Sequence, residues 1–160
     1  MDRIDSIIQH RLFLQHLEEN RQAEEERVFC HHDMAHFLDV ARIGRIINLE
    51  ESVGLDPELI YAAALLHDLG KHMQYENGTP HEQASAVIAL PILQECGFDE
   101  AETTLVTAAI RSHCDASVAG ERNLSGVLYR ADKASRACYA CNAACACNWK
   151  GNKKNLTISY

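Results

Sequence analysis

The chain has 160 residues, a hydrophobic content of 47% and a net charge of −8. This composition excludes an intrinsically disordered chain and is typical of one globular domain with a buried core. The negative charge argues against nucleic acid as the main partner, because proteins bind that polyanion with clusters of Lys and Arg. A small anionic substrate stays compatible, since a bound metal ion can outweigh the overall sign of the charge.

The sequence contains no apolar run long enough to span a bilayer, so no membrane partner is expected. Its N-terminus, MDRIDSIIQH, carries charges from the second residue and does not resemble a signal peptide. The seven cysteines are therefore expected to be reduced thiols or metal ligands rather than disulfides. Together these features predict a cytoplasmic protein.

Residues 2–26 are predicted to form one long amphipathic helix. Its apolar face is expected to carry Ile4, Ile7, Ile8 and Leu14. The charged run of residues 24–27 at its end is typical of a solvated helix surface. A homodimer could form through this helix, although nothing in the sequence requires one.

A second helix is predicted from the His-rich segment 31–36 to about residue 51. The residues of its buried stripe are His36, Val40, Ile43 and Ile47. A third helix is expected to begin with Asp56 as its N-cap and Pro57 at its first position, and to end with Gly70 as its C-cap. Lys71 would then interact with the negative end of the helix dipole.

The apolar run 60–66 of the third helix ends abruptly in adjacent His67 and Asp68. Burying these two polar groups without partners would cost about a few kcal/mol for each group. A cation bound between them would remove that cost.

A polar loop is expected from Gly70 to Gly78. The fourth helix is predicted to start with a capping box between Thr79 and Glu82 and to kink at Pro91. His81 lies at the start of its inward stripe.

The fifth helix is expected to begin at Asp99, and its apolar stripe ends at His113. The apolar face of the sixth helix carries Leu124, Val127, Leu128 and Ala131. Asp132 lies one turn beyond Leu128. Because no segment alternates with period two, the predicted fold class is all-α, a compact bundle of about six to seven helices.

Five of these predicted helices carry ionisable side chains at or near one end of the buried stripe. These side chains are His36, His67 with Asp68, His81, His113 and Asp132. Any one of them could be an ordinary hydrogen-bonded residue, but as separate buried groups each would need its own partner. A shared cation centre would satisfy all of them at once.

Imidazole and carboxylate ligands without thiolate suit iron, manganese, cobalt, nickel or zinc with expanded coordination. The four ligands of a first ion would be His36, His67, Asp68 and Asp132. They would leave open positions for water and substrate. His81 and His113 would bind a second ion, with Asp68 as the bridge. One or two divalent ions are therefore expected.

The pattern of His36, the pair His67-Asp68 and a late Asp132 resembles the HD superfamily of metal-dependent phosphohydrolases. The short motifs HFLDVAR, ALLHDLGK and YRADK are similar to the sequences around the family's metal ligands. The resemblance covers about residues 28–137, so residues 1–137 are expected to form an HD domain that includes the N-terminal helix. It implies an HD-domain type of fold.

His81 and His113 resemble the additional ligands of the dinuclear branches, which include hydrolases of diadenosine tetraphosphate. The Gly-Tyr-Pro signature of the cyclic-dinucleotide phosphodiesterases is absent. The resemblance implies hydrolysis of a nucleotide or other phosphate ester by metal-activated water, with His67, Asp68 and Lys71 as catalytic candidates. The alternative is a non-catalytic regulatory domain that binds a nucleotide or metal and senses redox state or metal through its cysteines.

Further residues near the motif have open roles. Lys71 is either a phosphate contact or a helix-end charge, and Arg111, Arg130 and Lys133 are weaker candidates for substrate contacts. His32 could be an extra ligand, a base behind the ligands or polar surface, and a place in the substrate pocket is favoured. The remaining histidines of this region, His31 and His72, are interpreted as surface residues.

The segment 138–160 follows the motif and is expected to pack on the domain or to be loosely ordered. It contains Cys138, Cys141, Cys145 and Cys147. A continued sixth helix would place the first three on one face. Two interpretations stay open: a zinc or iron–sulfur site that could recruit Cys30, or small buried apolar side chains that happen to be thiols.

Overall fold

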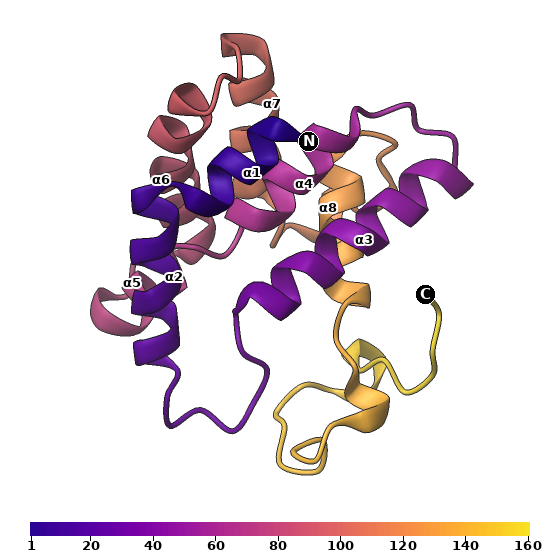
Figure 1. Ribbon diagram of the computed structural model, residues 1–160. Helices are drawn as coiled ribbons and strands as arrows, with labels where there is room; N and C mark the ends of the chain where they lie inside the picture. Colours follow the sequence, from indigo (N-terminus) through magenta and orange to yellow (C-terminus); the bar gives the residue numbers. More distant parts are fainter.

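The computed structural model describes residues 1–160, and every regular element in it is a helix (Figure 1). The α-helices are α1 (Asp2–Gln9), α2 (Arg11–Ala23), α3 (Met34–Glu50), α4 (Pro57–Leu66), α5 (Lys71–Asn77), α6 (His81–Glu95), α7 (Glu100–Ser112) and α8 (Leu124–Ala134). The 3₁₀ helices are η1 (Ala116–Gly120), η2 (Cys138–Ala140) and η3 (Gly151–Lys153). The predicted all-α fold is confirmed. There are more helices than predicted because the N-terminal helix is divided and α5 replaces a predicted loop.

The central helix is α4, which contacts α1, α3, α6, α7 and α8. Its residues 62–66 are fully buried, and its alanines allow the neighbouring helices to approach closely. The Asp56 side chain caps α4 by accepting a hydrogen bond from the backbone of Glu58, and Pro57 is its first residue, as predicted. The end of α4 therefore delivers His67 and Asp68 to the middle of the molecule.

The N-terminal region forms two helices, so the prediction of one helix over 2–26 was wrong. The chain turns at His10, whose backbone is extended and whose ring accepts a hydrogen bond from the Leu12 amide to cap α2. Ile4 and Ile7 are buried as expected, whereas Leu14 is exposed. The turn changes which face of α2 meets the core.

The end of α2 also differs from the predicted solvated run, because Glu24 is buried. Its carboxylate accepts hydrogen bonds from the Tyr75 hydroxyl at 2.8 Å and from the His32 backbone amide at 2.7 Å, and it also contacts His32 Nδ1. Burial alone would raise the pKa of Glu24, but the bonds from His32 lower it to about 2. Only Glu25 and Glu26 of this run are exposed surface residues.

The predicted loop from Gly70 to Gly78 is in fact helix α5, which ends where Gly78 adopts φ 79°. Gly70 is not a left-handed C-cap of α4; it precedes α5, and its amide donates to Ser85 Oγ at 2.9 Å. An added Cβ at Gly70 would lie 2.6 Å from Ala84 Cβ, so a side chain there would separate this turn from α6. Lys71 consequently begins α5 rather than following the end of α4.

The capping box predicted at the start of α6 does not form. Thr79 Oγ1 donates to Asn77 Oδ1 at 2.6 Å instead, and α6 continues through Pro91. In contrast, Asp99 and Glu102 form a complete capping box at α7, which the sequence predicted only as an Asp cap.

The C-terminal segment 135–160 leaves the end of α8 and folds back beside it (Figure 1). The Asn155 amide donates to the carbonyl groups of Lys133, Ala134 and Arg136. Because α8 ends at Ala134, the cysteines do not lie along a continued sixth helix. None of the helices is both long and apolar enough to cross a membrane.

Candidate metal centre

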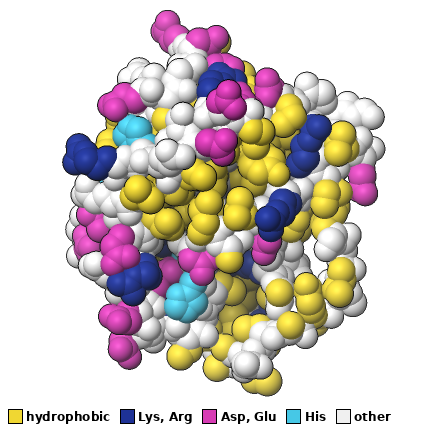
Figure 2. Space-filling view, viewed as in Figure 1, with side chains coloured by type: hydrophobic (Ala, Val, Ile, Leu, Met, Phe, Trp, Pro, Cys, Tyr) yellow, Lys and Arg dark blue, Asp and Glu magenta, His cyan; other side chains and the backbone are white.

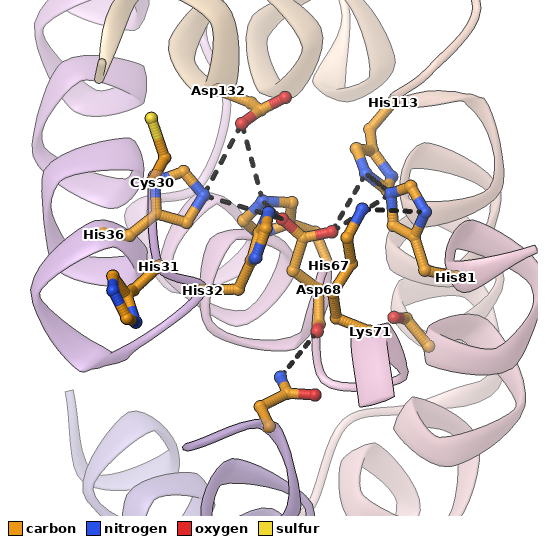
Figure 3. A network of polar contacts seen from close by, with 12 residues as sticks. Cys30, His31, His32, His36, His67, Asp68, Lys71, His81, His113 and Asp132 are labelled. Carbon is orange, nitrogen blue, oxygen red and sulfur yellow. Dashed lines mark hydrogen bonds and ion pairs between the residues drawn. The ribbon is translucent and has the colours of Figure 1, made fainter. Parts of the chain in front are cut away.

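All six predicted metal ligands converge between the ends of five helices (Figure 3). His36 lies in the first turn of α3, Asp132 lies in α8, and His81 begins α6. His67 and Asp68 follow α4, and His113 follows α7. Asp68 is at the middle of the cluster, and its two oxygens face different groups of side chains.

The first group consists of His36, His67, Asp68 and Asp132, whose ligand atoms all lie within 4.8 Å of one another. Asp68 Oδ2 is 3.0 Å from His67 Nε2 and 3.6 Å from His36 Nε2. Asp132 Oδ1 approaches the same two nitrogens, at 3.8 and 3.5 Å. Two carboxylates and two imidazoles therefore surround one point.

The second group consists of His81, His113 and Cys114. Asp68 Oδ1 lies 3.2 Å from His81 Nε2 and 3.4 Å from His113 Nε2. Cys114 Sγ lies 3.4 and 3.5 Å from the same two nitrogens. One oxygen of Asp68 thus faces each group, as a bridging carboxylate would require.

The rings are held so that their Nε2 atoms face Asp68. His67 Nδ1 donates to the Ala64 carbonyl at 2.7 Å, and His113 Nδ1 donates to the Ile110 carbonyl at 2.6 Å. Oxygen partners also hold the Nδ1 atoms of His81, from Gln74, and of His36, from Ser135. Such bonds set the tautomer and orientation of metal-binding imidazoles.

Several polar atoms on the four residues of the first group are buried without a hydrogen-bond partner. They are His36 Nε2, His67 Nε2, Asp68 Oδ1 and Asp132 Oδ1. Leaving a buried polar group unsatisfied costs about 1–3 kcal/mol, and more when the group is charged. A divalent cation would be a partner for these atoms together, so the residues fit a metal ion on their own chemistry.

The charge states of these side chains also favour a bound divalent cation. Burial would raise the pKa of Asp68 and Asp132, but neighbouring cationic imidazoles hold both pKa values well below their usual range, so both residues are carboxylates. Burial would lower the pKa of His67 and His113, but Asp68 raises them, to about 9 and about 10. Burial lowers the pKa of His81 to about 4, which leaves its ring neutral.

Comparison with known proteins identifies the family in which this arrangement of His and Asp residues occurs. The family model of the HD domain matches residues 34–140, which include all six ligands. The chain belongs to the HD domain family. We call the six residues the HD centre: His36, His67, Asp68, His81, His113 and Asp132.

The similar proteins differ in how much of the chain they share. An uncharacterized protein of Clostridium beijerinckii is 44% identical over 160 residues, the full length of both chains. Ribonuclease Y of Borreliella burgdorferi is 34% identical over 80 residues, which are 50% of this chain but only 14% of that enzyme.

A crystal structure gives the fold relationship. A predicted HD superfamily hydrolase from an uncultured Thermotogales bacterium superposes with a TM-score of 0.63 over 89% of this chain and 81% of that one, at 24% identity. The predicted resemblance to the HD superfamily and its type of fold are therefore confirmed.

The basic candidates around the HD centre occupy different positions. Lys71 Nζ lies 3.4 Å from His81 Nδ1, and Lys133 Nζ lies 2.5 Å from Asp132 Oδ2. Arg111 is exposed on α7. Arg130 donates to Glu51 and to backbone carbonyls. Lys71 and Lys133 are thus the two beside the metal ligands.

His32 lies behind the first group of the HD centre. It is buried, with Nδ1 against Glu24 and Nε2 3.8 Å from Asp68 Oδ2. The exposed His31 lies at the edge of the cluster, as predicted (Figure 3). His72 is buried, so its interpretation as a surface residue was wrong; α5 places it against α2.

Sequence reasoning missed two residues that contact the HD centre. Cys114 joins the second group, and its position next to His113 was the available signal. Asn20 of α2 is fully buried and donates to the Asp68 carbonyl at 2.9 Å, where it supports the turn behind the ligands. A single Asn within an amphipathic helix carries no comparable signal.

The four cysteines of the C-terminal segment do not form a group of converging ligand atoms. Cys145 is exposed, and Cys138, Cys141 and Cys147 are partly buried. Cys138 and Cys147 line a cavity together with Cys30.

Proposed function

We propose that this protein is a metal-dependent phosphohydrolase that acts on a nucleotide or a similar small phosphate ester. The observation that carries the proposal is the set of buried, unpartnered polar atoms on His36, His67, Asp68 and Asp132. When bound there, one or two divalent ions would polarise a phosphoryl oxygen and lower the pKa of water.

A cavity beside the HD centre supports an anionic substrate with an aromatic part. Its volume is about 480 Å³, within the range of small-molecule sites. It reaches Cys114 of the second group and Lys133, the neighbour of Asp132. Tyr129, Trp149 and Lys153 also line it. A hollow beside the C-terminal segment is visible in Figure 2.

A second, smaller cavity of about 210 Å³ is also lined by Trp149. It contains Arg27 and Arg136, and it is lined by His32. Guanidinium groups bind phosphate oxygens in pairs. The Arg136 guanidinium stacks on the Trp149 ring at 3.9 Å, so at most the other face of the indole is open to a base. A volume of this size suits one moiety of a nucleotide rather than a whole dinucleotide.

Around a bound phosphate ester, different residues of the chain would bind the phosphoryl group and transfer a proton. Lys71 and Lys133 would hold the negative charge of the phosphoryl group. His32, fixed by Glu24 through Nδ1, presents Nε2 to the same space and can accept or deliver a proton.

The test is a substrate screen with the metal-loaded protein and an Asp68→Asn variant. Wild type should hydrolyse a nucleoside monophosphate, a dinucleoside polyphosphate or an aryl phosphate with manganese, iron, cobalt, nickel or zinc. Asp68→Asn should lose about 10³-fold in turnover, because the bridging charge is removed. Asp39→Asn, which changes an exposed carboxylate on α3, is the control.

Saturable nucleotide binding with no turnover for any metal would contradict the proposal. It would favour the non-catalytic regulatory domain instead. Equal turnover in wild type and Asp68→Asn would show that the reaction occurs elsewhere.

A further inference from the structure

A third cluster of metal-ligating side chains lies between α2 and α5, which pack side by side (Figure 1). His16 Nδ1 is 3.0 Å from His72 Nε2. Glu19 Oε2 lies 2.8 Å from the first nitrogen and 3.1 Å from the second. These three atoms form a compact triangle that shares no residue with the HD centre.

Hydrogen bonds alone do not satisfy this triangle. Each imidazole nitrogen carries at most one hydrogen, and the ionised Glu19 carries none. If both nitrogens donate to Glu19, both carry hydrogens although the nitrogens are only 3.0 Å apart, so no hydrogen bond joins them. If only one nitrogen carries a hydrogen, one contact of the triangle joins two lone pairs. A cation in the middle would be faced by three lone pairs and would satisfy every contact.

The dimensions of the triangle suit a tetrahedral ion. With Zn–N bonds of about 2.0–2.1 Å, tetrahedral geometry places neighbouring ligand atoms about 3.3 Å apart. The observed separations are 2.8, 3.0 and 3.1 Å, so a shift of a few tenths of an ångström accommodates the ion. Three protein ligands and one water is a common zinc arrangement.

The surroundings of the triangle are also those of a metal site. His72 is buried, and its far nitrogen, Nδ1, has no hydrogen-bond partner but lies 3.6 Å from Glu76 Oε1. A carboxylate behind a metal-binding imidazole is a recurring arrangement. Glu19 is 34% exposed, which leaves room for a water ligand.

We propose that α2 and α5 bind a zinc-type divalent ion through His16 Nδ1, His72 Nε2 and Glu19, as a structural site separate from the HD centre. Imidazole and carboxylate ligands suit zinc, cobalt, nickel and copper. The ion would fix α5 to α2. The link to the HD centre is Asn20, which accepts a hydrogen bond from the His72 amide at 2.8 Å and donates one to the Asp68 carbonyl.

The experiment counts metal ions bound by the full-length chain. Wild type, His16→Gln and Glu19→Gln are stripped with a chelator, reloaded with Zn²⁺ or Co²⁺, desalted and analysed for metal. Wild type should retain about one equivalent more than either variant. The controls are His31→Gln, which removes an exposed imidazole, and Glu18→Gln, which removes the neighbouring exposed carboxylate.

Thermal unfolding separates this site from the HD centre. The rise in melting temperature caused by Zn²⁺ should persist in Asp132→Asn, which disrupts only the HD centre, and should shrink in His16→Gln. Equal metal content and equal Zn²⁺-dependent shifts in wild type, His16→Gln and Glu19→Gln would overturn the proposal. If His16→Gln does not fold, the result for Glu19→Gln is used instead. The Glu19 side chain is partly exposed, so this substitution should be tolerated by the fold.

Discussion

The two groups of ligands that flank Asp68 differ in donor chemistry and in burial. The first group adds two imidazoles and the carboxylate of Asp132, and it is enclosed by α3, α4 and α8. The second adds two imidazoles and the thiol of Cys114, and it lies at the ends of α6 and α7. His67, Asp132 and His113 are all almost completely buried, so the difference in exposure comes from Cys114, which is exposed.

This difference implies unequal binding by the two groups. The first group has more negative charge and less access to water, so its ion should bind tightly. The second shares only one carboxylate, and its sulfur favours softer ions. With an ion in each group, Asp68 would join a tight site to a more exchangeable one.

The largest effects should come from substitutions that each remove one ligand from one of the two groups. Asp132→Ala should lose the first ion and about 10³-fold in turnover, because it removes a buried charged ligand. His81→Ala should lose only the second ion and about 10–100-fold in turnover. Metal analysis and steady-state kinetics of both variants measure this contrast. Loss of both ions in both variants would show that the two groups bind as one unit.

The effect of pH on metal affinity should be smaller than the effect of losing a ligand. In the metal-free protein the pKa values of His67 and His113 are raised to about 9 and about 10, so both rings hold protons at pH 7. A metal must displace these protons, one in each group, so affinity should rise with pH up to about 9–10. Titration calorimetry in buffers of different ionisation enthalpy measures the protons released. Binding that is independent of pH between 6 and 9 would contradict this picture.

The smallest effect should come from Cys114→Ser, which replaces sulfur with oxygen in the second group only. The preference for Zn²⁺ over Mn²⁺ at that group should fall about tenfold, because thiolate favours the softer ion. Competition between the two metals measures the change. Cys145→Ser, at an exposed cysteine outside the HD centre, should leave the preference unchanged.

The sequence was most informative where buried stripes end in ionisable residues. His36, His67, His81 and His113 each follow or begin an apolar run, and a polar residue in such a place needs a partner. The structure brings these histidines together with Asp68 and Asp132. Helix periodicity and the need to satisfy buried groups were sufficient to place them.

The features that sequence did not reveal depend on tertiary contacts. Helix α5 has seven residues and no apolar stripe, so its sequence is that of a polar loop, and its packing makes His72 a buried residue. Glu24 lies in an acidic run that looks solvated, but α2 ends where His32 and Tyr75 can bond to it. The thiol of Cys114 contacts the HD centre only because α7 ends beside α6.

The distance between the two ligand groups depends on Gly70, which has no side chain. The turn at Gly70 lies directly against the first turns of α6, where even a methyl group would meet Ala84 at 2.6 Å. Because α6 begins with His81, any larger residue at this turn would move that ligand away from Asp68. This close contact, made by a residue that is not a candidate ligand, therefore helps to hold His81 beside Asp68. A side chain at Gly70 would therefore be expected to weaken the second group while leaving all of its candidate ligands in place.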